Sequence, residues 1–508
     1  MRTRLAIAAC AATVAGLLAL PSAAAEPQTT HGCLDSVPEP GSTAPVPICY
    51  SIFRPAGATA RRPVPLVFHS HGWGGSRTKD ATSFTGWLDR GLGVLSFDQR
   101  GFGDSGGKAH VEHPDFEGQD VKRLVDLVAA LPWVVKDGPR DPRIGAIGGS
   151  YGGGYQFVGA FTELRDRGRT RFDALAPEIT WFDLKESLAP KDVVRTAWVS
   201  ALYAAGNASD AHTDTVHRGF AYGAATGTWP KGEAGIDLDE FFAKNGPKWH
   251  VSQGRRLDIP VLFGQGATDN LFPLEQGLQN FDKALTPRAR AKSIFVGYNG
   301  GHALPTALPA GIGGAGDPCS TALGGGSFGD LSRLFMARHL RGDSVRLRGL
   351  GQYHLATAEG RCVSVRSVRA DTAASLGTLV SPTGAGAPVS WKIADGPITI
   401  AGTPYLDALV TAPGVLNRVF LGLSIGTTPA DARVVQHNML PHHEPVPVTA
   451  AQRRVELPSV AVDVPAGQSL FLTVSPLSDM YVAHGSRIPG AMVLDKATVR
   501  LPVVEPKS

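Results

Sequence analysis

Neither sign of charge predominates in this 508-residue sequence. It contains 49 lysines and arginines against 45 aspartates and glutamates, a formal net charge of +4. This balance gives no electrostatic reason to expect a nucleic acid as partner. The composition is not that of a disordered chain either, because 43% of the residues are hydrophobic and 19% are charged. A chain of this length predicts two or three globular domains.

Long apolar runs are missing after the first 25 residues. The N-terminal segment begins with Arg2 and Arg4, continues as an apolar stretch up to Leu20 and ends in small residues at 23–25. This order is typical of an export signal, so we expect cleavage near Ala25 and a secreted product. A retained anchor is the alternative, but the stretch is short for a bilayer span, and we expect no stable membrane span in the mature chain.

Cysteine is scarce, with five in the whole chain. Removal of the signal takes away Cys10 and leaves Cys33, Cys49, Cys319 and Cys362. An even number in an exported protein suggests two disulfides, and of the three possible pairings we favour Cys33 with Cys49 and Cys319 with Cys362, since each closes a modest loop. No C-x-x-C spacing supports a metal site.

Glycine is abundant around one serine. Gly148-Gly149-Ser150-Tyr151-Gly152-Gly153 follows a short apolar stretch at 143–147 and precedes a helical pattern at 155–160. Strand, G-x-S-x-G and helix together indicate a nucleophile elbow, in which small residues let the strand and the helix approach closely. Ser150 is therefore the candidate nucleophile; the alternative is a glycine-rich turn with an incidental serine.

Buried strands alternate with helical patterns around this elbow. Apolar strands are predicted at 64–70, 93–98, 260–266 and 291–298, and a helix face recurs over 121–131. Near-continuous apolar strands of this kind form a parallel sheet, whose ligands lie at the carboxyl ends of the strands.

Two polar residues follow later strands in the order that serine hydrolysis needs. Asp269 comes after the strand at 260–266, and His302 comes after the strand at 291–298. In the α/β-hydrolase fold the nucleophile, acid and histidine arrive in this sequence, each on a loop at the carboxyl end of a strand. We therefore predict a catalytic triad of Ser150, Asp269 and His302.

The oxyanion of the tetrahedral intermediate needs preorganised donors. We assign one to the backbone N–H of Tyr151, directly after the nucleophile. The second is assigned to the loop His71-Gly72-Trp73-Gly74, at the backbone N–H of Trp73.

Other polar residues have structural interpretations. Asp98 precedes the serine in the chain and is expected to brace its loop through Arg100, while His69 and His71 are expected to bond within the loop that follows their strand. Asp258 lies before its strand, at the end away from the site.

A metal site in the C-terminal part is a weaker hypothesis. His437, His442 and His443 lie near Glu444, but their spacing is irregular, and we expect solvated loop histidines. No metal and no cofactor are predicted.

The chain divides into five segments. Residues 183–250 interrupt the alternation with helical, aromatic-rich patterns, which predict a cap inserted over the sheet's carboxyl edge. Beyond about residue 345, short β-type runs between turns predict an all-β sandwich or jelly roll. The predicted boundaries are 1–25 signal peptide, 26–182 and 256–344 α/β-hydrolase domain, 183–255 helical cap, and 345–508 C-terminal β domain.

Several motifs together resemble a known family. Asp98-Gln99-Arg100-Gly101-Phe102-Gly103-Asp104-Ser105, the Ser150 elbow, Gly266-Ala267-Thr268-Asp269 and Arg338-His339-Leu340-Arg341-Gly342 are similar to the Xaa-Pro dipeptidyl-peptidase-like hydrolases, which include bacterial cocaine esterases and glutaryl-acylase-type enzymes. The resemblance implies an α/β-hydrolase with a cap after the elbow and a C-terminal jelly roll.

The sequence departs from that family at one point. Some members are thought to supply an oxyanion donor from a tyrosine hydroxyl where this chain has Trp73. An Xaa-Pro dipeptidase also needs an acidic residue for the substrate amine, and the sequence does not identify it: Glu178, Asp183, Glu186 and Asp210 are candidates, and the alternative is that none of them serves.

These observations favour an exported serine hydrolase that cleaves an ester or amide through an acyl-enzyme on Ser150. The alternative within this class is an Xaa-Pro dipeptidyl-peptidase. The alternative outside it is a catalytically inert surface-binding protein. The expected partner is a small ester, amide or peptide substrate, and the oligomeric state is left open.

Overall fold

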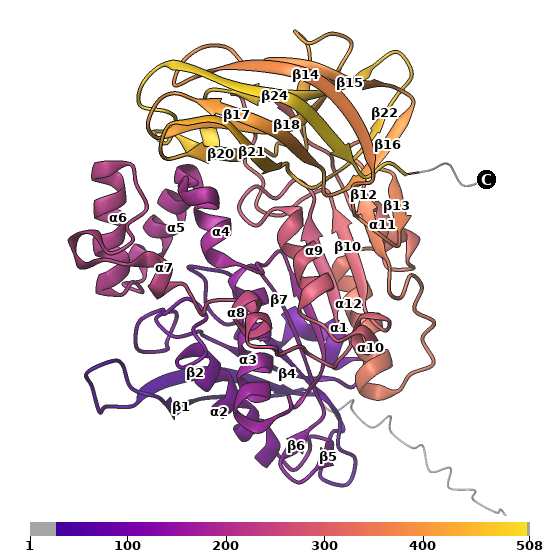
Figure 1. The fold of residues 1–508 in the computed structure, drawn as a ribbon. Coiled ribbons are helices and arrows are strands. Elements are labelled where there is room, and N and C mark those ends of the chain that lie inside the picture. The colour runs from indigo at the N-terminus through magenta and orange to yellow at the C-terminus, as the bar shows by residue number, and fades with distance from the viewer. Residues whose placement is uncertain (1–26, 505–508) are drawn as a thin grey trace, which may run out of the picture.

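The computed structural model describes residues 27–504, so the predicted signal at 1–25 lies outside the described residues. Figure 1 shows a mixed sheet with flanking helices, a group of helices to one side and a β-rich part above both. Within residues 27–504 no helix is long and apolar enough to cross a membrane.

The central sheet has ten strands in the order β1-β2-β4-β3-β7-β8-β9-β10-β12-β13. The strands from β4 to β12 in this order run parallel, and β1, β2 and β13 pair antiparallel at the two edges. The bounds are β1 Gln28–Ser36, β2 Val46–Arg54, β3 Leu66–Ser70, β4 Gly93–Phe97, β7 Ile144–Gly149, β8 Phe172–Glu178, β9 Leu262–Gly266, β10 Ile294–Tyr298, β12 Tyr353–Ala356 and β13 Cys362–Val365; a small hairpin, β5 Lys136–Gly138 and β6 Asp141–Pro142, lies apart. The carboxyl ends of the parallel strands therefore meet at one edge.

Helices cover both faces of this sheet. Phe68, Phe263 and Phe295 point to one face and pack with α2 Glu117–Ala130, α3 Tyr151–Arg167, α9 Leu274–Lys283 and α10 Pro287–Arg290. Their neighbours Val67 and Leu262 point to the opposite face, with α1 Thr85–Leu88, α11 Pro318–Ala322 and α12 Phe328–Met336. Burial on both faces explains why these strands are apolar throughout.

The segment between β8 and β9 forms the helical insertion. Its helices are α4 Leu184–Leu188, α5 Thr196–Ala208, α6 Asp214–Thr226, α7 Leu238–Phe241 and α8 Pro247–Ser252. Apolar side chains of this insertion, which we call the cap, pack against Trp73 and Phe102 from loops at the carboxyl edge of the sheet and against Tyr151 at the start of α3. In Figure 1, α4 to α7 lie beside that edge and below the β-rich part.

The C-terminal part is β-rich and encloses its own apolar core. One sheet has the order β11-β19-β18-β23-β15, with β20 paired to β18; another has the order β14-β24-β17-β21; β16 pairs with β22. The bounds are β11 Gly311–Ile312, β14 Thr372–Thr383, β15 Val389–Asp395, β16 Ile398–Gly402, β17 Tyr405–Ala412, β18 Asn417–Gly426, β19 Arg433–Val435, β20 Leu440–Glu444, β21 Val448–Glu456, β22 Val460–Val464, β23 Ser469–Ser475 and β24 Gly490–Leu501. An α/β-hydrolase fold followed by a β-rich domain confirms the predicted fold class.

The hydrolase and β-rich parts are joined more closely than the sequence indicated. The central sheet continues through β12 and β13 to Val365, past the boundary expected at residue 345. In return, β11, from the loop after β10, pairs with β19 of the β-rich part. Short apolar strands look alike in sequence, and only their pairing assigns them to a sheet.

Two disulfides join strands and helices near the edges of the central sheet. Cys33 and Cys49 lie opposite one another in β1 and β2, with an S–S distance of 2.04 Å. Cys319 of α11 bonds to Cys362 of β13, with an S–S distance of 2.06 Å. These are the two pairings that loop length favoured.

One buried histidine of α8 makes folding stability depend on pH. His250 is 1% exposed and its ring stacks on Phe161 at 4.6 Å. Among the described residues neither ring nitrogen has a hydrogen-bond partner. Burial lowers the pKa of His250 from 6.5 to about 3, helped by repulsion from Arg255. The native ring is therefore neutral where the unfolded one is charged.

We expect His250 to destabilise the fold in acid. Between pH 6.5 and 3 the unfolded chain binds a proton that the native state does not, so the free energy of unfolding falls as the pH falls through this window. At pH 5 the loss from this group is about 2 kcal/mol. Urea unfolding at pH 7.5 and at pH 5 measures how much the free energy of unfolding falls between the two pH values. In His250→Phe this fall should be smaller than in the wild type by about that amount. An equal fall in both proteins contradicts the role of His250.

Candidate active site

Ser150 stands at the sharp turn between β7 and α3. Its backbone has φ 58° and ψ −123°, in the left-handed half of the map where non-glycine residues are strained. A Cβ at Gly148 would lie 2.5 Å from the carbonyl oxygen of Gly152, and a Cβ at Gly152 would lie 2.5 Å from that of Ser70. Only glycine fits at these two positions, and the close approach that it permits forms the elbow.

The structure brings Ser150, His302 and Asp269 together. The His302 Nε2 to Ser150 Oγ distance is 2.9 Å, and the His302 Nδ1 to Asp269 Oδ2 distance is 2.7 Å. The three residues follow β7, β10 and β9, so each lies on a loop at the carboxyl edge of the sheet. This is the arrangement in which a histidine accepts the serine proton while a carboxylate fixes its tautomer.

Backbone amides hold the Asp269 carboxylate in place. Its Oδ1 accepts hydrogen bonds from the N–H groups of Leu271 at 3.0 Å and Phe272 at 2.7 Å, and its Oδ2 accepts one from the His302 N–H at 3.0 Å. The side chain is fully buried. Gly301, with φ 93°, allows this approach because a Cβ there would lie 2.6 Å from Oδ2.

A cap residue is tied to the histidine loop, a contact that sequence reasoning missed. The Trp198 indole N–H donates to Asn270 Oδ1 at 2.8 Å, and Asn270 Nδ2 donates to the carbonyl of Leu304 at 2.6 Å. The Trp198 ring also meets the His302 ring edge-on, with centroids 5.8 Å apart. The one sequence feature that could have indicated a role for Asn270 is its position directly after Asp269.

The loop after β3 lies beside the elbow. The Gly72 carbonyl accepts from His71 Nδ1 at 2.8 Å and from the Gly75 N–H at 3.0 Å, while His71 Nε2 accepts from the Gln99 N–H at 3.1 Å. Burial lowers the pKa of His71, which keeps its ring neutral for these two roles. The Gly72 carbonyl is thereby fixed, and the Trp73 N–H points the opposite way.

Two backbone amides near Ser150 are available as donors. Within residues 27–504, neither the Tyr151 nor the Trp73 N–H donates to another protein group. Gly72 is adjacent to the serine, because a Cβ added there would lie 3.8 Å from Ser150 Cβ. The Trp73 indole N–H donates to the Leu202 carbonyl of the cap at 2.8 Å and is thus already engaged.

Comparison with known proteins identifies the family. The sequence matches the X-Pro dipeptidyl-peptidase (S15) family over residues 46–303, half of the chain. The matched range includes Ser150, Asp269 and His302. The chain belongs to the S15 family. It is therefore a serine hydrolase of the esterase or peptidase type. No curated protein sequence matches it.

Solved structures share the fold of this S15 protein at low sequence identity. A CocE/NonD family hydrolase from Staphylococcus aureus has a TM-score of 0.63 at 13% identity, covering 94% of this chain and 97% of the other. An α-amino acid ester hydrolase has a TM-score of 0.60 at 12% identity over 96% and 99%. An aminopeptidase from a marine sediment Thaumarchaeota archaeon has a TM-score of 0.60 at 14% identity over 94% and 96%. The likeness covers the hydrolase, cap and β-rich parts together.

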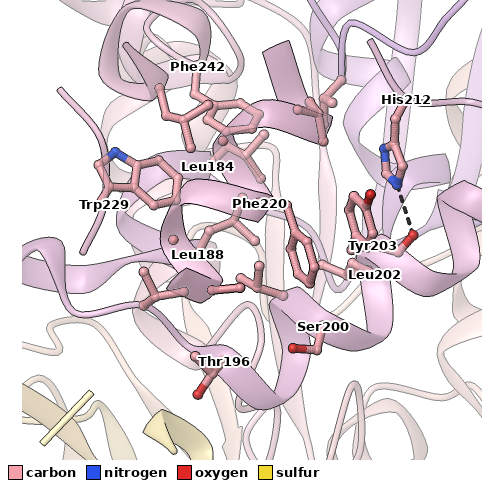
Figure 2. A pocket seen from close by; sticks show the side chains of 18 of the residues that line it. Leu184, Leu188, Thr196, Ser200, Leu202, Tyr203, His212, Phe220, Trp229 and Phe242 are labelled. Atoms are coloured by element: carbon pink, nitrogen blue, oxygen red, sulfur yellow. Dashed lines mark hydrogen bonds between the residues drawn. The ribbon is translucent and has the colours of Figure 1, made fainter. Parts of the chain in front are cut away.

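An apolar pocket of about 180 Å³ opens beside Ser150 (Figure 2). Trp73, Tyr151 and Phe272 contribute to its wall from the hydrolase part, and His484 contributes from the β-rich part. The cap supplies most of the lining, including Leu184, Leu188, Val194, Val199, Leu202, Tyr203, Val216, Phe220, Trp229, Leu238 and Phe242. Among the described residues, no Asp, Glu, Lys or Arg lines it.

The candidate amine-binding acids of this S15 protein lie elsewhere. Glu178 accepts a hydrogen bond from the Tyr298 hydroxyl at 2.6 Å, Asp183 caps α4, and Asp210 is exposed beside Lys108. Glu186 is also outside the pocket lining, and burial raises its pKa. The Glu178 carbonyl accepts a hydrogen bond from the Ser150 N–H at 2.9 Å, but none of the four acids lines the pocket beside Ser150.

The competing acids Asp98 and Asp258 have structural roles, with one correction to the expected partner of Asp98. Asp98 is fully buried, but it pairs with Arg77 rather than with Arg100, which pairs with Asp120. These partners come from distant elements that a linear sequence does not bring together. Asp258 forms an exposed pair with an arginine, away from the site.

One histidine of the β-rich part differs from the expectation of a solvated loop residue. His442 is buried rather than solvated, because β20 pairs with the central strand β18, and its Nε2 lies 3.1 Å from Glu444. Glu444 also pairs with Arg453 at 2.7 Å. In the described part of the chain, no three His, Cys, Asp or Glu side chains could hold a metal ion.

Proposed function

We propose that this S15 protein is a carboxylic-ester or acyl hydrolase that works through an acyl-enzyme on Ser150. His302 Nε2 accepts the Ser150 proton as Oγ attacks the carbonyl carbon, and Asp269 stabilises the imidazolium that forms. The N–H groups of Tyr151 and Trp73 would donate to the oxyanion. His302 then protonates the leaving group, and water, activated by the same histidine, hydrolyses the acyl-enzyme.

The observation that carries this proposal is the uncharged pocket beside Ser150. A dipeptidyl-peptidase must hold a substrate ammonium group, and burying that charge without a carboxylate partner is costly. Within residues 27–504 no acidic side chain lines the pocket. The ester or acyl hydrolase is therefore preferred to the Xaa-Pro dipeptidyl-peptidase, although two proteins of similar structure are an α-amino acid ester hydrolase and an aminopeptidase.

Export of the protein is a further part of the proposal. Two disulfides fit an oxidising compartment, where such bonds persist. They agree with the predicted signal at the N-terminus.

A substrate comparison tests the proposed activity. With purified protein, kcat/KM for butyryl p-nitroanilide should exceed that for an Xaa-Pro p-nitroanilide by at least about a hundredfold, because the leaving group is the same and the missing carboxylate partner for the amine is worth roughly 3 kcal/mol. A ratio in favour of the Xaa-Pro substrate would establish the dipeptidyl-peptidase instead. Failure of a fluorophosphonate probe to label Ser150 would favour the inert binding protein.

A further inference from the structure

We infer that the pocket beside Ser150 holds the acyl part of the substrate and that this acyl group is an aliphatic chain longer than acetyl. The inference rests on the proposed function and specifies its substrate class. It has three supports: the identity of the active-site residues that line the pocket, the chemistry of the pocket wall, and the room left at one glycine of α6.

The pocket wall contains Ser150 and the proposed oxyanion donors, Trp73 and Tyr151, but not His302. The leaving group must approach His302 Nε2 to receive its proton. The substituent that enters the pocket is therefore the one that stays on the serine.

The wall offers hydrocarbon and few free polar groups. The Trp229 indole N–H already donates to Asp239 at 2.9 Å. The Tyr203 hydroxyl lies 2.9 Å from His217 Nδ1, and the Tyr203 carbonyl lies 2.9 Å from His212 Nε2. In Figure 2 the labelled leucines and aromatic rings surround the space between the cap helices. An amide or a sugar would lose its hydrogen bonds to water there, whereas an alkyl chain gains from burial.

Two glycines of α6, one turn apart, line the pocket. Gly219 has no room for a side chain, since a Cβ there would lie 2.9 Å from Leu238. Gly223 is different, because a Cβ there meets only the Thr228 carbonyl oxygen, at an ordinary 3.5 Å. A larger side chain at Gly223 can therefore be built without a clash at its Cβ and would take up pocket volume. This position sets how long a chain the pocket accepts.

A chain-length series tests the inference. For p-nitrophenyl esters from acetyl to dodecanoyl, kcat/KM should rise about fourfold per added methylene until the pocket is full. Gly223→Leu should lower the octanoyl-to-acetyl ratio at least about tenfold, the value of roughly two buried methylenes. Gly223→Ala should lower it less. The matched control is Ala225→Leu, at an exposed α6 position outside the pocket lining, which should leave the ratio unchanged.

The failures of the inference and of the proposed function are distinguishable. A flat or falling profile with Ser150-dependent hydrolysis overturns the inference alone, as does a ratio that Gly223→Leu leaves unchanged. No hydrolysis of any ester overturns both.

A binding measurement does not depend on turnover. Methyl octanoate should raise the Tm of Ser150→Ala more than methyl acetate does, and adding Gly223→Leu should remove the difference. Equal shifts from the two esters contradict the aliphatic acyl site.

Discussion

Replacing Ser150 with alanine should lower kcat for p-nitrophenyl butyrate by about 10⁴-fold or more. The nucleophile is the only group of the proposed triad that bonds to the substrate, and its Oγ lies 2.9 Å from His302 Nε2. Without Oγ no acyl-enzyme forms, and the remaining rate comes from the oxyanion donors and binding alone.

The fold should tolerate this replacement. Alanine has the same backbone restrictions as serine at φ 58°, so Tm should change little. Ser252→Ala, at an exposed serine of α8, is the matched control and should keep full activity. A Ser150→Ala variant that is folded and still turns over at the wild-type rate would exclude Ser150 as the nucleophile.

Replacing Asp269 with asparagine should cost about 10⁴-fold in kcat. The Asp269 carboxylate accepts from His302 Nδ1 at 2.7 Å and so leaves Nε2 free to accept the serine proton. An amide group can turn its NH₂ toward Nδ1, and the imidazole then carries its proton on Nε2, where it cannot act as a base. The position of the His302 ring is kept, but its neutral form is the wrong tautomer for accepting the serine proton.

The test is kcat across pH for Asp269→Asn beside Asp258→Asn. Asp258 lies before β9, where its carboxylate is paired with an arginine at the surface, and the same chemical change there should leave the rate within about twofold. KM should move far less than kcat in Asp269→Asn. A fall of less than tenfold would mean that another group orients His302.

Local pattern explains which features of this protein were predictable. The elbow needs glycine at fixed positions around Ser150, and Asp269 and His302 each follow a recognisable buried strand, so their meeting at one sheet edge follows from parallel topology. The fold class and the S15 relationship follow from the same motifs and are confirmed.

Features that depend on distant partners were not predictable. The Trp198 to Asn270 hydrogen bond joins residues 72 positions apart, and the Asp98 partner proved to be Arg77. Nothing local in Tyr353–Ala356 distinguishes a strand of the central sheet from a strand of the β-rich part. In each case packing selects one partner among several that local preference allows.

The pairing of β11 with β19 bears on how this enzyme can be rebuilt. The chain that leaves His302 is held by the β-rich part, because the Thr306 N–H donates to His437 Nδ1 at 3.2 Å and the Ala307 N–H donates to Asp479 at 2.7 Å. The histidine loop is thus anchored at both of its ends, one in each part. The hydrolase part is therefore not an independent unit. Without the β-rich part, the loop that follows His302 would lose these contacts, so a shortened version of the protein must keep both parts.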